Sequence, residues 1–509
     1  MKLLLLSVNK EKAVRPVLPI GMMTVAAQVL KAGHKVDCLD LCFEVDDETC
    51  VKKKVKDDQP DVIGISIRNI DSQSFLEPIF YSPLVLQVVE WCRAEKLNAI
   101  IVLGGAGFSQ VPEELLRYTN ADYGLMSFAE KSMPLLMDRI SQDQSVDDVE
   151  GIIYLSTDGT VYRKEPAFEI DYTNVEPPAR QFYDKRYFSF GYQTQDSSEK
   201  VVETVQSKKG CVLECIFCSN FVVDGTGVTL KSVKGIVDEI ESIIQKSEVN
   251  GFEFVDGVFN LPIRHALNIC HEMEERRINI PWTCMLNPGA VTEELLEAMA
   301  KTGCKSIDFG TDSCSDPILT ILKKKFTKEK IIQSHRIVEK FGIEIMHCVF
   351  IGNPGDTKDT IRETFDVMDQ LVSNQEGSKS HVYWTLGLRI CKGTDLHKIA
   401  IEQGVLKQND ELGVPRFYIA PGILEDEKLL DEIEQRVVAN KNWYLWWGLP
   451  NLSLKERVRQ VQRENKKMEK LYLETLRSQD LIRKGKLYGF SRYLQSKESR
   501  NSSEENFIV

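Results

Sequence analysis

The chain has 509 residues, of which 42% are hydrophobic and 28% charged, and its formal net charge at pH 7 is −12. This length exceeds what one hydrophobic core usually holds, so we expect two or three domains. The acidic balance disfavours a nucleic-acid-binding protein. The apolar run at residues 3–6 is too short to cross a membrane, so it predicts a first buried strand, with no transmembrane segment and no signal peptide.

The first predicted domain covers residues 1–145 and alternates apolar runs with helical patterns. Most of these runs are continuous, as in parallel strands that are covered on both faces of a sheet. The runs lie at residues 3–8, 35–41, 61–67, 99–105 and 122–126, and the helical patterns at 19–32, 83–95, 112–118 and 129–140. The pattern predicts a doubly wound α/β domain, which binds its ligand at the carboxyl ends of the strands.

Three of these strand ends carry chemically marked residues. Residues 19–21 follow the first strand, Arg68 and Asn69 follow the third, and Gly104, Gly105 and Gly107 follow the fourth. Glycines let a backbone approach a ligand closely, ahead of a helix start that could favour a phosphate. A plain tight turn explains the same glycines about as well.

Residues 146–200 are predicted to connect two domains. Strand-like segments at 151–156 and 161–164 flank an Asp-Gly turn, which indicates a hairpin. A Pro-rich and aromatic segment without periodicity follows and predicts a linker that lies over a surface.

Three cysteines stand at CxxxCxxC spacing in one glycine-led loop: Cys211, Cys215 and Cys218. Three thiolates can hold three irons of a [4Fe-4S] cluster and leave the fourth iron open to an exogenous ligand. Zinc is the alternative, but structural zinc prefers four ligands in paired sets, and no further Cys or His follows within forty residues. The other ten cysteines are scattered in mostly apolar segments, which predicts reduced core residues and a cytoplasmic protein.

Residues 201–400 repeat a strand-and-helix unit. The predicted strands lie at 201–205, 252–255, 282–285, 306–309, 345–350 and 382–386. Six such units form a partial barrel, whose active site lies at the carboxyl ends of the strands. Chemically unusual residues follow four of these strands: Asp256, Asn287, Asp312 with Ser313, and the turn that contains Gly352, Asn353 and Gly355.

Residues 401–509 are predicted to form a helical C-terminal region, with helical patterns at 425–440 and 453–485. These helices could cap the barrel. The Lys/Arg-rich face of 455–486 could touch an anionic partner or membrane, although a solvated face is favoured.

The cysteine spacing, Phe217 and the segments 309–327, 350–360 and 387–396 resemble the radical S-adenosylmethionine (SAM) enzymes. Pro19, Gly21, the Gly33-His34 pair, Asp40 and the strand at 60–66 resemble the cobalamin-binding domain that precedes the radical domain in the cobalamin-dependent members. This resemblance implies a [4Fe-4S] cluster, SAM and cobalamin as cofactors. It also implies an electron donor such as flavodoxin or ferredoxin.

In that family, SAM chelates the open iron, and the reduced cluster cleaves SAM to a 5'-deoxyadenosyl radical. The resemblance implies that Asp256 faces the amino group of SAM, and that Asp312 and Ser313 face its ribose and carboxylate. It places Gly352, Asn353 and Gly355 on the adenine side, with backbone atoms of Phe217. Gly257 departs from the family, where a second acidic residue is usual.

The resemblance further implies cobalamin with its base displaced, because the DxHxxG loop of the cobalamin mutases is missing. His34 is expected at the surface, at the end of the sheet opposite the ligand. Arg68, with Asn69, is the candidate for the lower face of the corrin; the alternative is an Arg68–Asp71 pair that holds the loop. Gly104, Gly105 and Gly107 would line the nucleotide tail, whose path is affected by the loss of a GEGE-like sequence at 126–130.

The leading hypothesis is therefore an enzyme that passes a methyl group from SAM through methylcobalamin to an unactivated carbon. One alternative uses the same cofactors for a radical cyclisation or rearrangement without methyl transfer. An alternative of another class is a sensor or binding protein. The substrate stays open among small molecules, peptides and lipids, since fold analogy does not transfer specificity.

Overall fold

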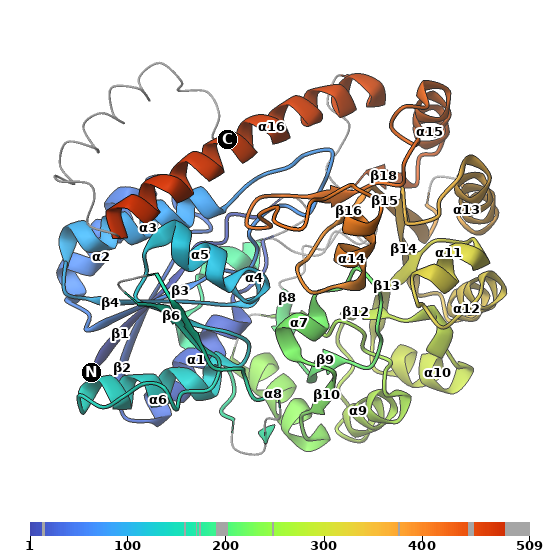
Figure 1. The fold of residues 1–509 in the computed structure, drawn as a ribbon. Helices are drawn as coiled ribbons and strands as arrows, with labels where there is room; N and C mark the ends of the chain where they lie inside the picture. Colours follow the sequence, from blue (N-terminus) through green and yellow to red (C-terminus); the bar gives the residue numbers. More distant parts are fainter. Residues whose placement is uncertain are drawn as a thin grey trace.

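A computed structural model describes residues 1–12, 16–156, 159–168, 171–172, 175–189, 202–246, 249–374, 377–445 and 452–483. Two α/β lobes lie side by side, and the long helix α16 (Leu454–Arg483) runs across both of them (Figure 1). No helix in these ranges combines the length and the apolar character needed to cross a membrane.

The first lobe is built on a seven-stranded sheet with the order β2-β1-β3-β4-β5-β6-β7. Its strands are β1 (Lys2–Ser7), β2 (Lys35–Asp40), β3 (Val62–Ser66), β4 (Ile100–Gly104), β5 (Tyr123–Leu125), β6 (Ile152–Leu155) and β7 (Val161–Arg163). The first five are parallel, and β6 and β7 add an antiparallel hairpin. This is the predicted doubly wound fold, with the strand order reversing at β1 and β3. The hairpin is also confirmed; residues 157–158 of its turn lie outside the described ranges.

Helices cover both faces of this sheet, which explains the continuous apolar strands. Leu4 and Leu6 of β1 belong to one core cluster, while Leu3 and Leu5 belong to the cluster on the other face. The helices are α1 (Ile20–Lys31), α2 (Asp47–Asp58), α3 (Ser82–Glu95), α4 (Ala106–Gln110), α5 (Pro112–Thr119) and α6 (Ala129–Ser141). Helix α2 was not expected, because only Val51 and Val55 of its largely charged sequence are buried.

The second lobe is a curved sheet of seven parallel strands in the order β18-β15-β14-β13-β12-β11-β8. The strands are β8 (Val202–Val205), β11 (Gly251–Phe254), β12 (Trp282–Leu286), β13 (Cys304–Asp312), β14 (Glu344–Ile351), β15 (Ser380–Leu386) and β18 (Trp443–Leu445). The six predicted strands are confirmed. The seventh, β18, is a correction to the predicted helical C-terminal region, since its residues extend the barrel sheet by pairing with β15.

Helices lie along the outer side of the second sheet (Figure 1). They are α8 (Val233–Lys246), α9 (Ile263–Glu275), α10 (Glu293–Lys301), α11 (Asp316–Ile321), α12 (Lys328–Lys340), α13 (Lys358–Leu371) and α15 (Glu427–Ala439). Helix α14 (Asp395–Glu402) lies instead beside the cysteine loop (Figure 1), where the N–H of Leu396 donates to the carbonyl of Ile216. Short 3-10 helices lie at Arg180–Phe182, Lys185–Ser189 and Pro288–Ala290. Two small antiparallel pairs complete the lobe: β9 (Lys208–Cys211) with β10 (Gly227–Leu230), and β16 (Leu388–Arg389) with β17 (Phe417–Tyr418).

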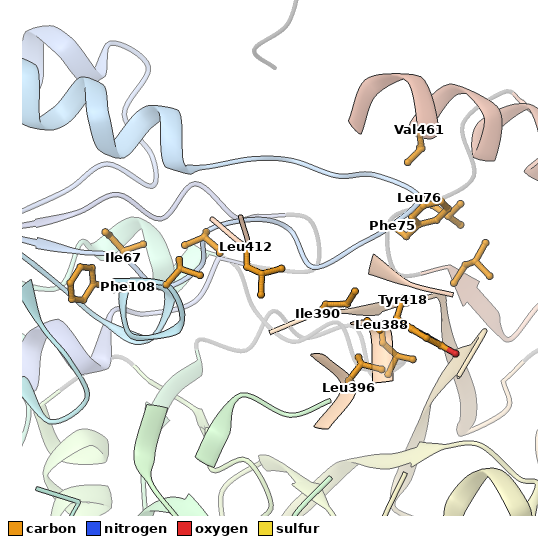
Figure 2. Close-up of a cluster of buried hydrophobic side chains, with 14 of the residues drawn as sticks. Ile67, Phe75, Leu76, Phe108, Leu388, Ile390, Leu396, Leu412, Tyr418 and Val461 are labelled. Atoms are coloured by element: carbon orange, nitrogen blue, oxygen red, sulfur yellow. The ribbon is translucent and has the colours of Figure 1, made fainter. Parts of the chain in front are cut away.

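The two lobes share one hydrophobic core. Figure 2 shows Ile67 and Phe108 of the first lobe at its left and Leu388, Ile390 and Tyr418 of the second lobe further right, and all five belong to one cluster of buried side chains. Val461 of α16 belongs to the same cluster. Because the apolar packing runs across the junction, the lobes are held at a fixed spacing rather than joined by a bare linker.

Candidate active site

The cysteine loop begins where β9 ends and leads into helix α7 (Asn220–Asp224). All thirteen cysteines of the chain are free thiols. Ile216 anchors the loop, because its N–H donates to the carbonyl of Leu322 and its own carbonyl accepts from Leu396. Burial raises the pKa of Cys215, and raises that of Cys218 to about 12.

The three thiols come from one loop, as the spacing predicts. Among the described residues, His, Cys, Asp and Glu side chains do not form a set of three that could hold a metal ion. The donor chemistry nevertheless fits an iron-sulfur cluster, since three free thiols occupy one anchored loop. Cluster ligation by Cys211, Cys215 and Cys218 stays a prediction.

Asp256 fixes the strand that leads to Cys211. Its carboxylate, in a residue only 4% exposed, accepts hydrogen bonds from the N–H and hydroxyl of Ser207 and from the N–H of Lys208. The ammonium of Lys208 donates to the carbonyls of Phe259 and Leu261, at 2.8 and 2.7 Å. Burial raises the pKa of Asp256. The Asp256 carboxylate is thus already hydrogen-bonded to Ser207 and Lys208. Its contact with SAM stays a prediction.

Asp312 lies at the end of β13 and forms a buried ion pair that the sequence did not reveal. Its carboxylate lies 2.5 Å from the ammonium of Lys324, and the two side chains are only 4% and 7% exposed. Burial alone would lower the pKa of Lys324. The nearby Asp312 carboxylate and the Cys215 and Cys218 thiols outweigh burial, so the pKa of Lys324 is raised above its ordinary value. Lys324 therefore places a positive charge between the cysteine loop and the end of β13.

Lys324 was missed because it stands in a run of three lysines, a pattern typical of a solvated face. In the structure Lys323 and Lys325 are exposed, whereas Lys324 is buried. Both flanking lysines have positive φ, 59° and 57°, so the local backbone is unusual. This conformation depends on the tertiary packing and leaves no mark in the residue pattern.

Ser313, beside Asp312, faces protein rather than open space. Its hydroxyl lies 3.2 Å from the hydroxyl of Thr364 and accepts from the N–H of Ser315. Only 1% of Ser313 is exposed. The structure thus brings Asp312 to the cysteine loop and gives Ser313 a bond within the turn.

The turn with Gly352, Asn353 and Gly355 packs tightly against its own lobe. Asn353 is fully buried, and its side-chain amide donates to the carbonyl of Phe350. Gly355 has φ of +86°, and a β-carbon there would lie 2.7 Å from Ile321. The rings of Phe217 and Phe350 meet edge to face, with centroids 5.2 Å apart. Phe217 therefore contacts the strand that precedes this turn, and adenine contacts by these residues stay predictions.

Arg68 is exposed at the carboxyl end of β3, where the predicted cobalamin face lies. The alternative interpretation of an Arg68–Asp71 pair stays open. Asp71 also pairs with Arg389, because its carboxylate accepts from Nε of Arg389 at 2.6 Å. That pair is buried and joins the two lobes. The amide of Asn69, with its oxygen and nitrogen exchanged, bonds the backbone and guanidinium of Arg68.

The glycines after β4 are required by the neighbouring loop. A β-carbon on Gly105, which has φ of +98°, would lie 2.5 Å from the carbonyl oxygen of Ile67. One on Gly107 would lie 3.0–3.1 Å from the backbone of Arg68 and Asn69. Because Gly105 and Gly107 have no side chains, the loops after β3 and β4 can pack against each other. This packing explains the two glycines without any ligand. Gly104 has more room, and contacts of all three with cobalamin stay predictions.

His34 lies at the opposite end of the sheet, as expected, since Nδ1 is 3.4 Å from the N-terminal amine. It is not a bare surface residue, however. Nε2 lies 3.1 Å from the carboxylate of Asp138, and only 9% of its side chain is exposed. The expectation that His34 is a surface residue is wrong, because helix α6 covers the turn that holds His34.

The carboxyl edge of the first sheet faces the cysteine loop. Helix α4, directly after β4, packs against α7, directly after the cysteine loop (Figure 1). Two ion pairs secure this junction: Lys392 with Glu114 at 2.7 Å, and Lys209 of β9 with Glu130 of α6. Each pair joins a residue of the first lobe to a residue of the second.

Comparison with known proteins matches both lobes. The model of the B12 binding domain matches residues 7–136, and that of the Radical SAM superfamily matches residues 205–368. The chain therefore combines a B12-binding domain with a radical SAM domain.

Several relatives extend over most of the chain. A tryptophan 2-C-methyltransferase from Streptomyces laurentii is 23% identical over 78% of this chain and 74% of its own length. An uncharacterized methyltransferase from Pyrococcus horikoshii is 24% identical, over 73% of this chain and 78% of its own. The solved structure of the methyltransferase TsrM from Kitasatospora setae, with cobalamin and a [4Fe-4S] cluster bound, has a TM-score of 0.74 at 20% identity. It covers 93% of this chain and 99% of its own.

Proposed function

We propose that this protein is a cobalamin-dependent radical SAM methyltransferase that acts on an unactivated carbon. The observation that carries the proposal is the junction of α4 with α7, which brings the ligand edge of the B12-binding lobe against the cysteine loop. Relatives named tryptophan 2-C-methyltransferase and hopanoid C-3 methylase, the latter from Methylococcus capsulatus, support methylation at carbon. When bound, the cluster, SAM and cobalamin would supply radical formation and methyl transfer.

The residues of the chain would position these groups. Cys211, Cys215 and Cys218 would hold the cluster, and Lys324 would hold the carboxylate of Asp312 in place beside it. Asp256 keeps β9 in register, so Cys211 is presented at a fixed point. The shared core between the lobes would exclude water from the space where the radical forms.

A second candidate is a radical cyclisation with the same cofactors. It is supported by a relative named anaerobic magnesium-protoporphyrin IX monomethyl ester cyclase, from Rubrivivax gelatinosus, which is 23% identical over 68% of this chain. The mass of the product separates the two, because only methylation adds a methyl group from SAM. A sensor without turnover is the remaining alternative.

The test begins with anaerobic reconstitution of the whole chain. We expect about four irons and four sulfides per chain, bound cobalamin, and formation of 5'-deoxyadenosine from SAM under reduction. Cys215→Ala should abolish the cluster and this product. Stoichiometric zinc, with a fold that survives iron chelation, would overturn the cluster assignment.

Cobalamin binding is tested by spectra of two variants. Arg68→Ala should admit a ligand below the cobalt and shift the visible and electron paramagnetic resonance spectra, whereas His34→Ala should leave them unchanged. A spectrum that responds to His34 but not to Arg68 would contradict the assignment. Further parts of the proposal are a small-molecule substrate, a flavodoxin or ferredoxin as electron donor, and a cytoplasmic location, which the thirteen free thiols support.

A further inference from the structure

Helix α16 carries a stripe of basic side chains on its exposed face. Because an α-helix turns about 100° per residue, side chains spaced by three, four and seven residues lie on one face. Four exposed basic residues of α16 have this spacing, and we call them the basic stripe: Arg463, Lys466, Lys470 and Arg477. Glu474, at the margin of the same face, is the one exposed acid within this length of the helix, so positive charge predominates there.

The far side of α16 is buried, and this fixes the direction in which the stripe points. Val461, on the face opposite the stripe, is 0% exposed. An ion pair of Asp480 with Arg117 of α5, at 3.1 Å, ties the helix to the first lobe. Another, of Glu469 with Arg416 at 2.6 Å, ties it to the second. The helix is therefore held against the protein with the stripe turned outward, and it lies along one edge of the molecule (Figure 1).

The protein does not neutralise this stripe. On other exposed helices a lysine pairs with an acid one turn away, as Lys234 does with Asp238 at 2.7 Å. Within the described part of the chain, none of the four stripe side chains forms an ion pair. Lys466 and Lys470 are instead one turn apart, and like charges at this spacing repel each other and weaken a helix. A solvated face usually mixes both signs of charge, so this stripe indicates a partner of opposite charge.

The charge of α16 also differs from that of the whole chain. Leu454–Arg483 contains nine basic and five acidic residues, whereas the chain has a formal net charge of −12. A local positive surface on an acidic protein attracts anions only over a short range, about 8–10 Å at physiological salt. The partner must therefore come into contact with the stripe itself.

We propose that the basic stripe docks this protein on an anionic lipid surface. Anionic headgroups attract clustered Lys and Arg side chains near a membrane. From Arg463 to Arg477 the stripe is about 21 Å long, and a straight helix at the edge of the molecule can lie along a flat surface over this length. Leu471, beside the stripe and 60% exposed, adds an apolar contact at the level of the headgroups.

The stripe is less suited to other polyanions. Its four side chains include no aromatic ring on which a nucleic-acid base could stack. An acidic protein would have to supply a long groove to enclose a helix that lies at the edge of the molecule. A flat array of headgroups needs no such fit. The inference is independent of the proposed function, because it concerns where the protein works and not what it does to its substrate.

The test is co-sedimentation of the holoenzyme with vesicles of phosphatidylcholine alone, or of phosphatidylcholine with about one-third phosphatidylglycerol. We expect the anionic vesicles to bind at least about ten-fold more tightly, since each basic side chain near such a surface contributes to binding. Raising NaCl from about 0.1 M to about 0.5 M should abolish this preference, because salt screens the attraction.

Lys466→Gln combined with Lys470→Gln should weaken binding to the anionic vesicles by about ten-fold or more. Lys53→Gln combined with Lys56→Gln is the matched control, because it removes the same charge from the exposed face of α2 and should change nothing. All four side chains are exposed, so both variants should melt like the parent. Equal binding to the two vesicle compositions, or an equal loss in the control, would overturn the inference. Binding of poly-L-glutamate or of a DNA duplex through Lys466 and Lys470, without binding to anionic vesicles, would also overturn it.

Discussion

The ion pair between Lys324 and Asp312 gives a sharp test of how the site is built. Replacing Lys324 by Met keeps the length of the side chain and removes its charge. The Asp312 carboxylate, only 4% exposed, then remains buried without its counter-charge. Breaking a buried pair in this way costs about 3–5 kcal/mol, and solvent screening is small because both side chains are covered.

For a domain of roughly 200 residues, 1 kcal/mol corresponds to about 2–4 °C in Tm. Lys324→Met should therefore lower the Tm of the second lobe by about 6–20 °C, measured by circular dichroism on anaerobically prepared protein. Asp312→Asn should cost a similar amount, and the double variant should lose less than the sum of the two. We expect a coupling of about 2 kcal/mol, since both changes remove one interaction.

Lys325→Met is the matched control, because Lys325 is exposed, lies next in the chain and also has a positive φ. It should leave Tm within about 1 °C, as for most surface changes. Additive losses in the double variant, or a loss in Lys325→Met equal to that in Lys324→Met, would refute the role assigned to the pair.

Three other predictions follow from the described contacts. Gly105→Ala should destabilise the first lobe by about 1–3 kcal/mol, because its β-carbon would meet the Ile67 carbonyl at positive φ, whereas Gly21→Ala, which has open space, should not, as thermal melts would show. Burial is the main cause that raises the pKa of Glu203 to about 7. The protonated side chain therefore stabilises the fold fully below the ordinary pKa of 4.5, and this stabilisation is lost as the pH rises through 7. As the pH rises from 5 to 8, Glu203→Gln should therefore gain stability relative to the parent, while the exposed Glu293→Gln shows no such trend in melts across pH. Asp71→Ala should leave Arg389 buried without its carboxylate and speed proteolysis at the junction of the lobes; an unchanged cleavage rate would contradict a coupling role for this pair.

Local pattern was sufficient for much of this fold. The four leucines of β1 are buried on both faces of the sheet, so their continuous run signals a covered parallel strand. The cysteine spacing lies within one loop, and eight residues are enough to display it. Both features are local, and therefore legible in the sequence.

The features that were missed depend on contacts between distant residues. β18 is three residues long, and only its pairing with β15 makes it a strand. Lys324 differs from Lys323 and Lys325 in its backbone conformation and in the burial of its side chain, and neither difference is visible in a run of three lysines. Asp71 and Arg389 are 318 residues apart in the chain, so no local pattern could pair them. Helix α2 buries two valines among charged residues, too weak a periodicity to detect.

The central claim is that the B12-binding lobe and the cysteine loop act on SAM together. The most direct test incubates the reconstituted holoenzyme, with its cobalamin fully reduced, with SAM carrying a deuterated methyl group, in the absence of any other substrate. The account predicts about one equivalent of S-adenosylhomocysteine, with the deuterated methyl group found on the protein-bound cobalamin by mass spectrometry. Protein that holds both the cluster and cobalamin yet forms no S-adenosylhomocysteine would contradict it.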